Sequence, residues 1–169
     1  MLSHQDIGLP VVRANNIYDD KLDMTKDVKY WFNHDPQGAD IENYKISKND
    51  ILINFINSEA KMGTSAIVEK EPVRDMIYTT NILRMRMNKL CNIYFFQAQT
   101  HTNKYKNYIK GISKIAVNQA SFTTVDFRNF DFTLPELNEQ NNIGQYFSTL
   151  DKLVTLHQRK PKVTKNIYN

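Results

Sequence analysis

An apolar stripe with helical spacing near the C-terminus constrains the fold of this chain more than any other feature. It lies in the segment FTLPELNEQNNIGQYFSTLDKLVTLHQRKPK, residues 132–162, at intervals of four, three, four and three residues. That spacing corresponds to the a and d positions of a coiled coil over about two heptads. A helix this short is marginal alone in water, so the stripe must pack against its own domain or another chain, and periodicity leaves both open. The stripe residues are Ile143, Phe147, Leu150, Val154 and His157.

Local signals mark the two ends of this helix. Pro135 suits the first turn of a helix or the position before it, and Asn138 is a candidate N-cap. Glu139 then places a negative charge in the first turn, where it complements the helix dipole. Pro161 ends the helix because it lacks an N–H and its ring clashes with the preceding turn. The sequence thus predicts a domain over residues 1–134, a helix over residues 135–160 and a tail over residues 161–169.

The residues before this helix are predicted to be β-rich, with one helical interruption. GLPVVRANNI indicates a strand followed by a turn at Asn15 and Asn16, and GTSAIVEKEP indicates a strand that ends at Pro72. IYTTNILRMRM alternates at period two, which places Arg84 and Arg86 on one strand face. CNIYFFQAQTHTNKYKNYIKGI is helix-like, whereas SFTTVDFRNFDFTLP alternates aromatic residues and reads as a strand end. The expected fold class is α/β (α+β), a β-rich domain followed by a C-terminal helix of the coiled-coil type.

Composition allows a packed core and argues against several classes of protein. Of 169 residues, 41% are hydrophobic, and only 5 Gly and 5 Pro speak against a disordered or fibrous chain. The single cysteine, Cys91, cannot form an internal disulfide, and its apolar surroundings KLCNIYFF favour a buried thiol over a nucleophile. No run approaches the roughly 18 apolar residues of a membrane span, and MLSHQDIGLP lacks a signal pattern. We expect a cytoplasmic protein without a membrane partner.

Positive charge is concentrated in the second half of the domain. The net charge is only +4, yet residues 76–125 contain no Asp or Glu. An acid-free basic segment produces a local positive field, which favours a polyanion such as nucleic acid as the partner. The alternative is a solvated cationic face without a ligand. The basic residues of this segment are Arg84, Arg86, Lys89, Lys104, Lys106, Lys110 and Lys114.

Lysines and tyrosines interleave in this segment, a pattern that suits binding of nucleic acid better than catalysis. Lysines neutralise phosphates, and each such contact adds a salt-dependent contribution to affinity. Arginine reads guanine as a bidentate donor, a role open to Arg84 and Arg86. For any one residue, a solvated or half-buried structural side chain is an equally good interpretation. The candidate DNA-binding residues are Lys61, Arg84, Arg86, Lys104, Tyr105, Lys106, Lys110 and Lys114.

Few motifs of enzyme chemistry are present. The four histidines are not spaced as metal ligands, and the sequence contains neither a phosphate-binding loop nor a nucleophile elbow. We therefore predict no catalytic residue and no metal site. One alternative stays open, a small Mg²⁺-dependent nuclease. Asp50, Glu59 and Lys61 have the order of two metal-binding carboxylates and a lysine that assists the attacking water.

The C-terminal segment carries a resemblance to a known family. LPELNEQNNIGQYFSTLDKLVTLHQRK resembles the stretch that closes a target recognition domain in the specificity subunit of type I restriction–modification enzymes. GLPVVRANNIYDDKLD, YKISKNDILIN and ISKIAVNQASFTTVDFRNFDFTLP resemble earlier steps of that domain, so the likeness covers residues 8–160. The positions that match the family's helix entry are Leu134, Pro135, Leu137, Glu139, Gln140, Ile143, Leu150 and Asp151.

The resemblance implies an α/β recognition domain carried on a spacer helix. It implies sequence-specific binding of double-stranded DNA without catalysis by this chain. Methylation with S-adenosylmethionine would belong to a modification subunit, and cleavage with ATP and Mg²⁺ to a restriction subunit, so the chain needs no cofactor of its own. Spacer helices of the family pair as an antiparallel coiled coil and dock modification subunits. The helix-pairing residues would then be Ile143, Phe147, Leu150 and Val154.

The chain also departs from the family pattern. It has one recognition domain and one spacer helix where a typical subunit has two of each, and its helix stops at Pro161. We therefore expect either a half-subunit that forms a homodimer through the spacer helix or a truncated or recombined cassette. A two-fold pair would read a palindromic, split target, because half-site symmetry follows protein symmetry. Besides the nuclease, a protein that acts only through its terminal helix is the remaining alternative.

Overall fold

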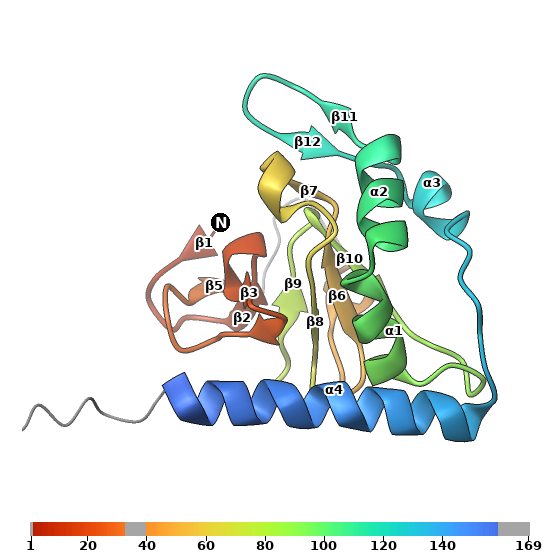
Figure 1. Cartoon of the computed structure of the whole chain (residues 1–169). Coiled ribbons are helices and arrows are strands. Elements are labelled where there is room, and N and C mark those ends of the chain that lie inside the picture. The colour runs from red at the N-terminus through yellow and green to blue at the C-terminus, as the bar shows by residue number, and fades with distance from the viewer. Residues whose placement is uncertain (1, 33–39, 159–169) are drawn as a thin grey trace, which may run out of the picture.

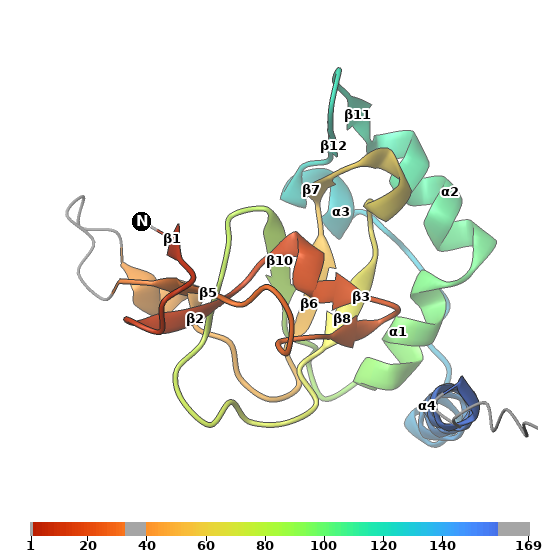
Figure 2. The ribbon, with the colours of Figure 1, turned by 90° about the vertical axis from the view of Figure 1, so that its left-hand side faces the viewer.

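The computed structural model describes residues 2–32 and 40–158, and the predicted helix end at Pro161 lies outside them. A body of small sheets and three short helices lies along one long helix, α4 (Leu137–Gln158) (Figure 1). Seen along α4, the body stands on one side of this helix only (Figure 2). The fold is mixed α/β with a C-terminal helix, which confirms the predicted class. No described helix has the length and apolar character needed to cross a membrane.

The centre of the body is an antiparallel sheet in the order β10–β6–β8. Its strands are β6 (Ile51–Asn54), β8 (Ser65–Ile67) and β10 (Ile82–Met85). Successive side chains of a strand point to opposite faces, and every residue of β6 is buried. Ile51 and Ile53 belong to the core on one face, whereas Leu52 belongs to the core on the other. The apolar run ILI therefore forms the centre of both cores.

Helices cover the first face of this sheet. They are α1 (Ile93–Thr100), α2 (Asn103–Ile112) and α3 (Thr124–Arg128). Each begins after a polar N-cap whose side-chain oxygen accepts a backbone N–H, and these caps are Asn92, Thr102 and Thr123. The helix-like pattern predicted for residues 91–112 is confirmed as two consecutive helices.

Short strands, most of them near the N-terminus, cover the second face. One sheet has the order β1–β5–β2–β9, formed by β1 (Leu2–Ser3), β5 (Lys29–Trp31), β2 (Leu9–Val12) and β9 (Ile77–Tyr78). A two-stranded hairpin follows β2 and comprises β3 (Ile17–Tyr18) and β4 (Lys21–Leu22). The turn between β3 and β4 has positive φ at Asp19 and Asp20, as expected for a tight hairpin.

A third small sheet has the order β11–β12–β7, from β11 (Lys114–Ile115), β12 (Ala120–Ser121) and β7 (Ile56–Asn57). The hairpin of β11 and β12 projects from the body at the end opposite α4 (Figures 1 and 2). Three short 3-10 helices connect strands elsewhere, at Ala14–Asn16, Ile41–Tyr44 and Glu59–Lys61.

Three local predictions are wrong. The predicted strand end before Pro135 is instead α3 followed by irregular chain, because Phe127, Phe130 and Phe132 pack against the helices around Tyr105 and Phe96. Tertiary burial of aromatic rings thus outweighs the local alternation. The strand predicted to end at Pro72 ends at Ile67. Asn138 is not an N-cap, because α4 begins at Leu137 and Asn138 lies inside it.

Helix α4 docks on the body through a small and polar face. Gln140 is 1% exposed, and its amide nitrogen donates to the carbonyls of Leu90 (2.9 Å) and Pro135 (2.8 Å). Its amide oxygen accepts the N–H of Asn92 at 2.8 Å. One turn later Gly144 is buried, and a Cβ there would lie 3.0 Å from the backbone nitrogen of Phe95. The start of α1 is therefore seated closely on α4.

Candidate nucleic-acid interface

Helix α2 presents lysines to solvent in a fixed direction. Tyr105 and Ile109 are buried in the helix-covered core, which orients the helix. Lys106 and Lys110 are exposed and four residues apart, so they lie on one face of the helix. Burial of the apolar side chains thus determines where the positive charge of α2 points.

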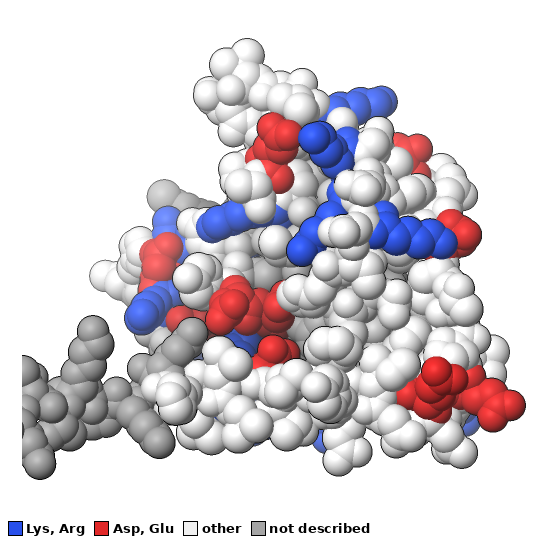
Figure 3. Space-filling view, viewed as in Figure 1, with Lys and Arg blue, Asp and Glu red and all other residues white. Residues whose placement is uncertain are grey.

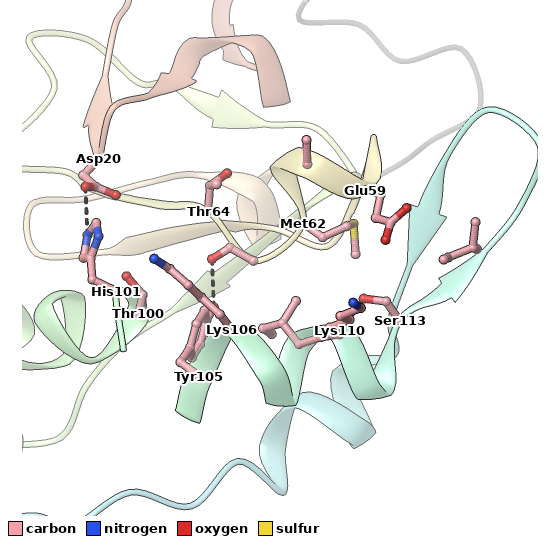
Figure 4. Close-up of a pocket in the computed structure, with 14 residues that line it drawn as sticks. Asp20, Glu59, Met62, Thr64, Thr100, His101, Tyr105, Lys106, Lys110 and Ser113 are labelled. Carbon is pink, nitrogen blue, oxygen red and sulfur yellow. Dashed lines mark hydrogen bonds and ion pairs between the residues drawn. The ribbon is translucent and has the colours of Figure 1, made fainter. Parts of the chain in front are cut away.

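These two lysines line a groove of about 620 Å³. Its opposite side is formed by Glu59, Met62 and Thr64, which belong to the 3-10 helix Glu59–Lys61 and the turn after it. Figure 4 shows Lys106 and Lys110 on one side of the groove and Glu59 on the other. The groove continues onto the projecting hairpin, because Ile115 of β11 also lines it. A cationic helix and a β-hairpin therefore form one continuous surface.

The prediction that Tyr105 binds DNA is wrong. Its ring is 2% exposed, and its hydroxyl donates to the carbonyl oxygen of Gly63 at 2.9 Å. Gly63 has a φ of +74°, a conformation that favours glycine. Burial raises the pKa of the Tyr105 hydroxyl, so it stays a neutral donor. Tyr105 joins α2 to the turn that forms the far side of the groove.

The two arginines of the predicted strand face are both engaged by the protein itself. Nε of Arg86 lies 2.6 Å and Nη2 3.2 Å from the two carboxylate oxygens of Asp50, a bidentate pair. Asp50 is 1% exposed and also accepts the N–H of Ser47 at 2.9 Å. Arg84 donates to the carbonyl of Lys45 and lies over the ring of Tyr78. Contact of these arginines with DNA bases stays a prediction. The Nε and Nη2 donors of Arg86 are already bonded to the carboxylate of Asp50.

The remaining candidate lysines occupy different positions. Lys61 ends the 3-10 helix beside the groove, and Lys114 is exposed at the start of β11. Lys104 is exposed and lies 3.4 Å from the exposed carboxylate of Asp131, an arrangement that contributes little stability. In Figure 3, basic side chains run across the upper half of the face over α2 with a few acidic side chains among them, and several acidic side chains gather nearer α4. DNA contact by these lysines stays a prediction.

A histidine–carboxylate pair closes the groove at the end near α4. Nε2 of His101 lies 2.8 Å from Oδ2 of Asp20, and Gln97 donates to the backbone carbonyl of Asp20 at 3.0 Å. The hydrogen bond to Asp20 raises the pKa of His101 above its ordinary value of 6.5, with Lys106 opposing and Asp151 assisting. The β3–β4 turn is thus attached to the end of α1.

The pair of His101 and Asp20 is expected to make part of the protein's folding stability depend on pH. Because the folded-state pKa of His101 is raised, its contribution is fully present below the unfolded pKa of about 6.5 and is lost as pH rises through the folded pKa. We expect the difference in free energy of unfolding between wild type and His101→Gln to shrink as pH rises from the unfolded pKa through the folded pKa. Urea unfolding between about pH 5 and pH 9 measures it. A difference that is constant with pH would contradict the assignment.

The geometry does not support the nuclease alternative. Asp50 precedes β6 and is held by Arg86, whereas Glu59 follows β7 and so comes after the other end of β6. Four strand residues alone span about 13 Å, too far for two carboxylates to share one Mg²⁺. Among residues 2–32 and 40–158, no group of three His, Cys, Asp or Glu side chains is placed to hold a metal ion.

Burial raises the pKa of the half-buried Cys91 thiol, which disfavours a thiolate nucleophile.

The apolar stripe of α4 forms a second exposed surface. Phe147 is 47% exposed, Leu150 38% and Val154 55%, while Ile143 is half-buried. The interpretation that this stripe packs on its own core is therefore wrong for most of its length. The helix docks through Gln140 and Gly144 instead, which leaves the stripe uncovered in this chain.

Residue type and periodicity missed the residues that hold these surfaces in place. Gln140 matched the family motif at the level of sequence, but the motif does not show the three hydrogen bonds that its side chain makes. The signal that was available is a polar residue and a glycine four apart, Gln140 and Gly144, which neighbour each other along one edge of the apolar stripe. Asp50 was considered only as a metal ligand, and its pairing with Arg86 is set by the register of β10 on β6.

Comparison with known proteins identifies the family of this chain. Residues 4–166 match the family described as the type I restriction modification DNA specificity domain. The chain is 35% identical over 149 residues to the type I restriction enzyme MjaX specificity subunit of Methanocaldococcus jannaschii, covering 88% of this chain and 34% of that protein. It therefore belongs to the family of type I restriction–modification specificity domains.

Two solved structures share the fold. A chain from a structure of an assembled type I restriction–modification system superimposes with a TM-score of 0.63 at 18% identity, covering 94% of this chain and 34% of that one. The HsdS subunit from Thermoanaerobacter tengcongensis gives a TM-score of 0.62 at 18% identity, covering 89% of this chain and 37% of that one. The chain thus spans about a third of the length of each of these relatives.

Proposed function

We propose that this chain is a target recognition module that binds double-stranded DNA in a sequence-specific manner. The observation that carries the proposal is the outward direction of Lys106 and Lys110, which burial of Tyr105 and Ile109 fixes along one groove. Fixed cations along a groove neutralise phosphates and set the register of a duplex. Membership in the specificity-domain family supports the same role.

In this proposal the chain performs no chemistry itself. It directs two partners to the recognised site: a modification subunit, which is a methyltransferase, and a restriction subunit. S-adenosylmethionine, ATP and Mg²⁺ then belong to those partner subunits. The protein works in the cytoplasm, where its DNA substrate is.

The exposed stripe of α4 supports a second part of the proposal, helix pairing. Phe147, Leu150 and Val154 are uncovered although they have the spacing of a coiled-coil seam. A partner helix, from a second copy of this chain or from a second recognition module, would bury them. Two modules related by a two-fold axis would read a split target with two half-sites.

Methylation in a living host tests the proposal. The chain is co-expressed with the modification subunit from its own locus in a host without adenine methylation, and the host DNA is sequenced for methylated adenine. A single recurring motif is the expected result, and a palindromic split motif is expected if two copies pair through α4. Expression of the modification subunit alone is the control. If both strains lack methylation although the two proteins co-purify, sequence-directed recruitment by this chain is wrong.

A further inference from the structure

The projecting hairpin of β11 and β12 has a rigid base and a free tip. Ala120 is 1% exposed and pairs with Asn57 of β7, and the N–H of Phe122 donates to the carbonyl of Phe55 at 3.2 Å. The turn at the tip is closed by the N–H of Ala116, which donates to the carbonyl of Gln119 at 2.8 Å. The backbone of the hairpin is therefore well supported, while residues 116–119 stand away from the body.

The side chains at this tip are unusually placed for a structural role. Val117 is 99% exposed and Ile115 is 68% exposed, so neither contributes to a core. Asn118 and Gln119, which follow Val117, are also exposed. Single exposed apolar residues are common on proteins, but here two of them share one projecting ribbon with two amides. The ribbon lies in the acid-free segment 76–125.

The hairpin continues the surface that carries the lysines of α2. Ser113 and Ile115 line the same groove as Lys106 and Lys110, and Lys114 is exposed beside them. A duplex whose phosphates contact these lysines would have the ribbon beside it. Phosphate contacts position a protein on DNA, whereas contacts to base edges specify the sequence.

We propose that the tip of this hairpin, Val117, Asn118 and Gln119, enters the major groove and reads bases there, an inference that rests on the proposed DNA-binding function. The major groove of B-form DNA admits a two-stranded β-ribbon. Asn and Gln side chains pair in bidentate fashion with adenine, and an apolar side chain contacts the methyl group of thymine. The tip therefore recognises A·T pairs. Arg86, by contrast, already donates to Asp50 through Nε and Nη2.

Selection of preferred duplexes from a random library tests this inference. The wild-type chain defines the preferred sequence, and affinity is then measured for that duplex and for an unrelated duplex of equal length at several salt concentrations. We expect Asn118→Ala combined with Gln119→Ala to lower the ratio of the two affinities at least tenfold, because each bidentate base contact is worth about 1–3 kcal/mol of discrimination. The slope of affinity against salt should not change, because no phosphate contact is lost. Val117→Ala should weaken the preference for thymine at one position.

Matched controls separate a base contact from a general surface effect. Val73 is as exposed as Val117, with a relative exposure of 106%, and lies on a different loop. Val73→Ala should leave the affinity ratio unchanged. All substituted side chains are exposed, so we expect every variant to fold. An unchanged circular dichroism spectrum checks this.

Two outcomes overturn the inference in different ways. If wild type prefers one sequence and the double variant keeps its affinity ratio within about twofold, far less than the loss of a base contact, the hairpin is not the reading element. If wild type binds no duplex, or binds all duplexes equally, the proposed recognition function is wrong and the inference is wrong with it.

Discussion

Replacing Lys106 and Lys110 together with alanine is expected to weaken binding to every duplex by a similar factor. Each lysine that neutralises one phosphate contributes about 0.9 to the slope of log affinity against log salt. Loss of two such contacts lowers the slope by about 1.8, which at 0.15 M salt corresponds to a loss in affinity on the order of 30-fold. The ratio between preferred and unrelated sequences should stay the same, because phosphate contacts carry no sequence information.

The control for this prediction is a variant with an equal change in charge. Lys48 and Lys70 are also exposed but do not line the groove. Lys48→Ala with Lys70→Ala should leave the salt slope within experimental error of wild type. Titration of a fluorescent duplex at four or more salt concentrations gives both slopes. Equal slopes of log affinity against log salt for the two double variants would show that the lysines of α2 do not contact DNA phosphates.

Gln140→Ala is expected to cost about 3 kcal/mol in free energy of unfolding. The substitution leaves the N–H of Asn92 and the carbonyls of Leu90 and Pro135 without the partner that Gln140 supplies at this part-buried contact. Each group left unsatisfied away from water costs about 1–3 kcal/mol, less for a carbonyl with a second lone pair. Gln145→Ala is the matched control, because Gln145 is an exposed residue of the same helix. That change should stay within about 0.5 kcal/mol.

Hydrogen exchange adds a second measurement for the same site. If Gln140 holds α4 on α1, Gln140→Ala should speed exchange in α4 more than in β6, because a docked helix opens locally before the core does. Gly144→Ala is expected to act in the same direction although alanine favours helix, since its Cβ would press on the backbone of Phe95. Equal stability of Gln140→Ala and Gln145→Ala would contradict the assigned role.

Much of the candidate surface could be predicted from residue type and spacing. The acid-free segment located the basic face, and the helical pattern of residues 91–112 placed Lys106 and Lys110 on α2. The heptad spacing of α4 and the motif around Gln140 indicated the family. These features are local, and each reflects a property that a few neighbouring residues decide, such as helix periodicity or net charge.

Other parts of the site required contacts between distant segments. Tyr105 had the composition of a nucleic-acid contact, yet its ring is buried and its hydroxyl reaches Gly63, 42 residues away in sequence. Arg86 looked free on its predicted strand, but β10 ends at Met85, and the pairing of β10 with β6 brings Arg86 to Asp50. Sequence periodicity does not say which partner a polar group finds, because that depends on the register and packing of elements far apart in the chain.

The sequence alone therefore determined the class of fold, the position of the positive charge and the presence of an apolar stripe with heptad spacing. Only the tertiary structure decided which face of α4 docks, because the choice rests on Gln140 filling a set of backbone hydrogen bonds and Gly144 allowing close approach of α1. It also decided that the hairpin of β11 and β12 projects beside the lysines of α2. Such placement follows from burial of Ala120 and Phe122 in the body, a consequence of packing that no local pattern carries.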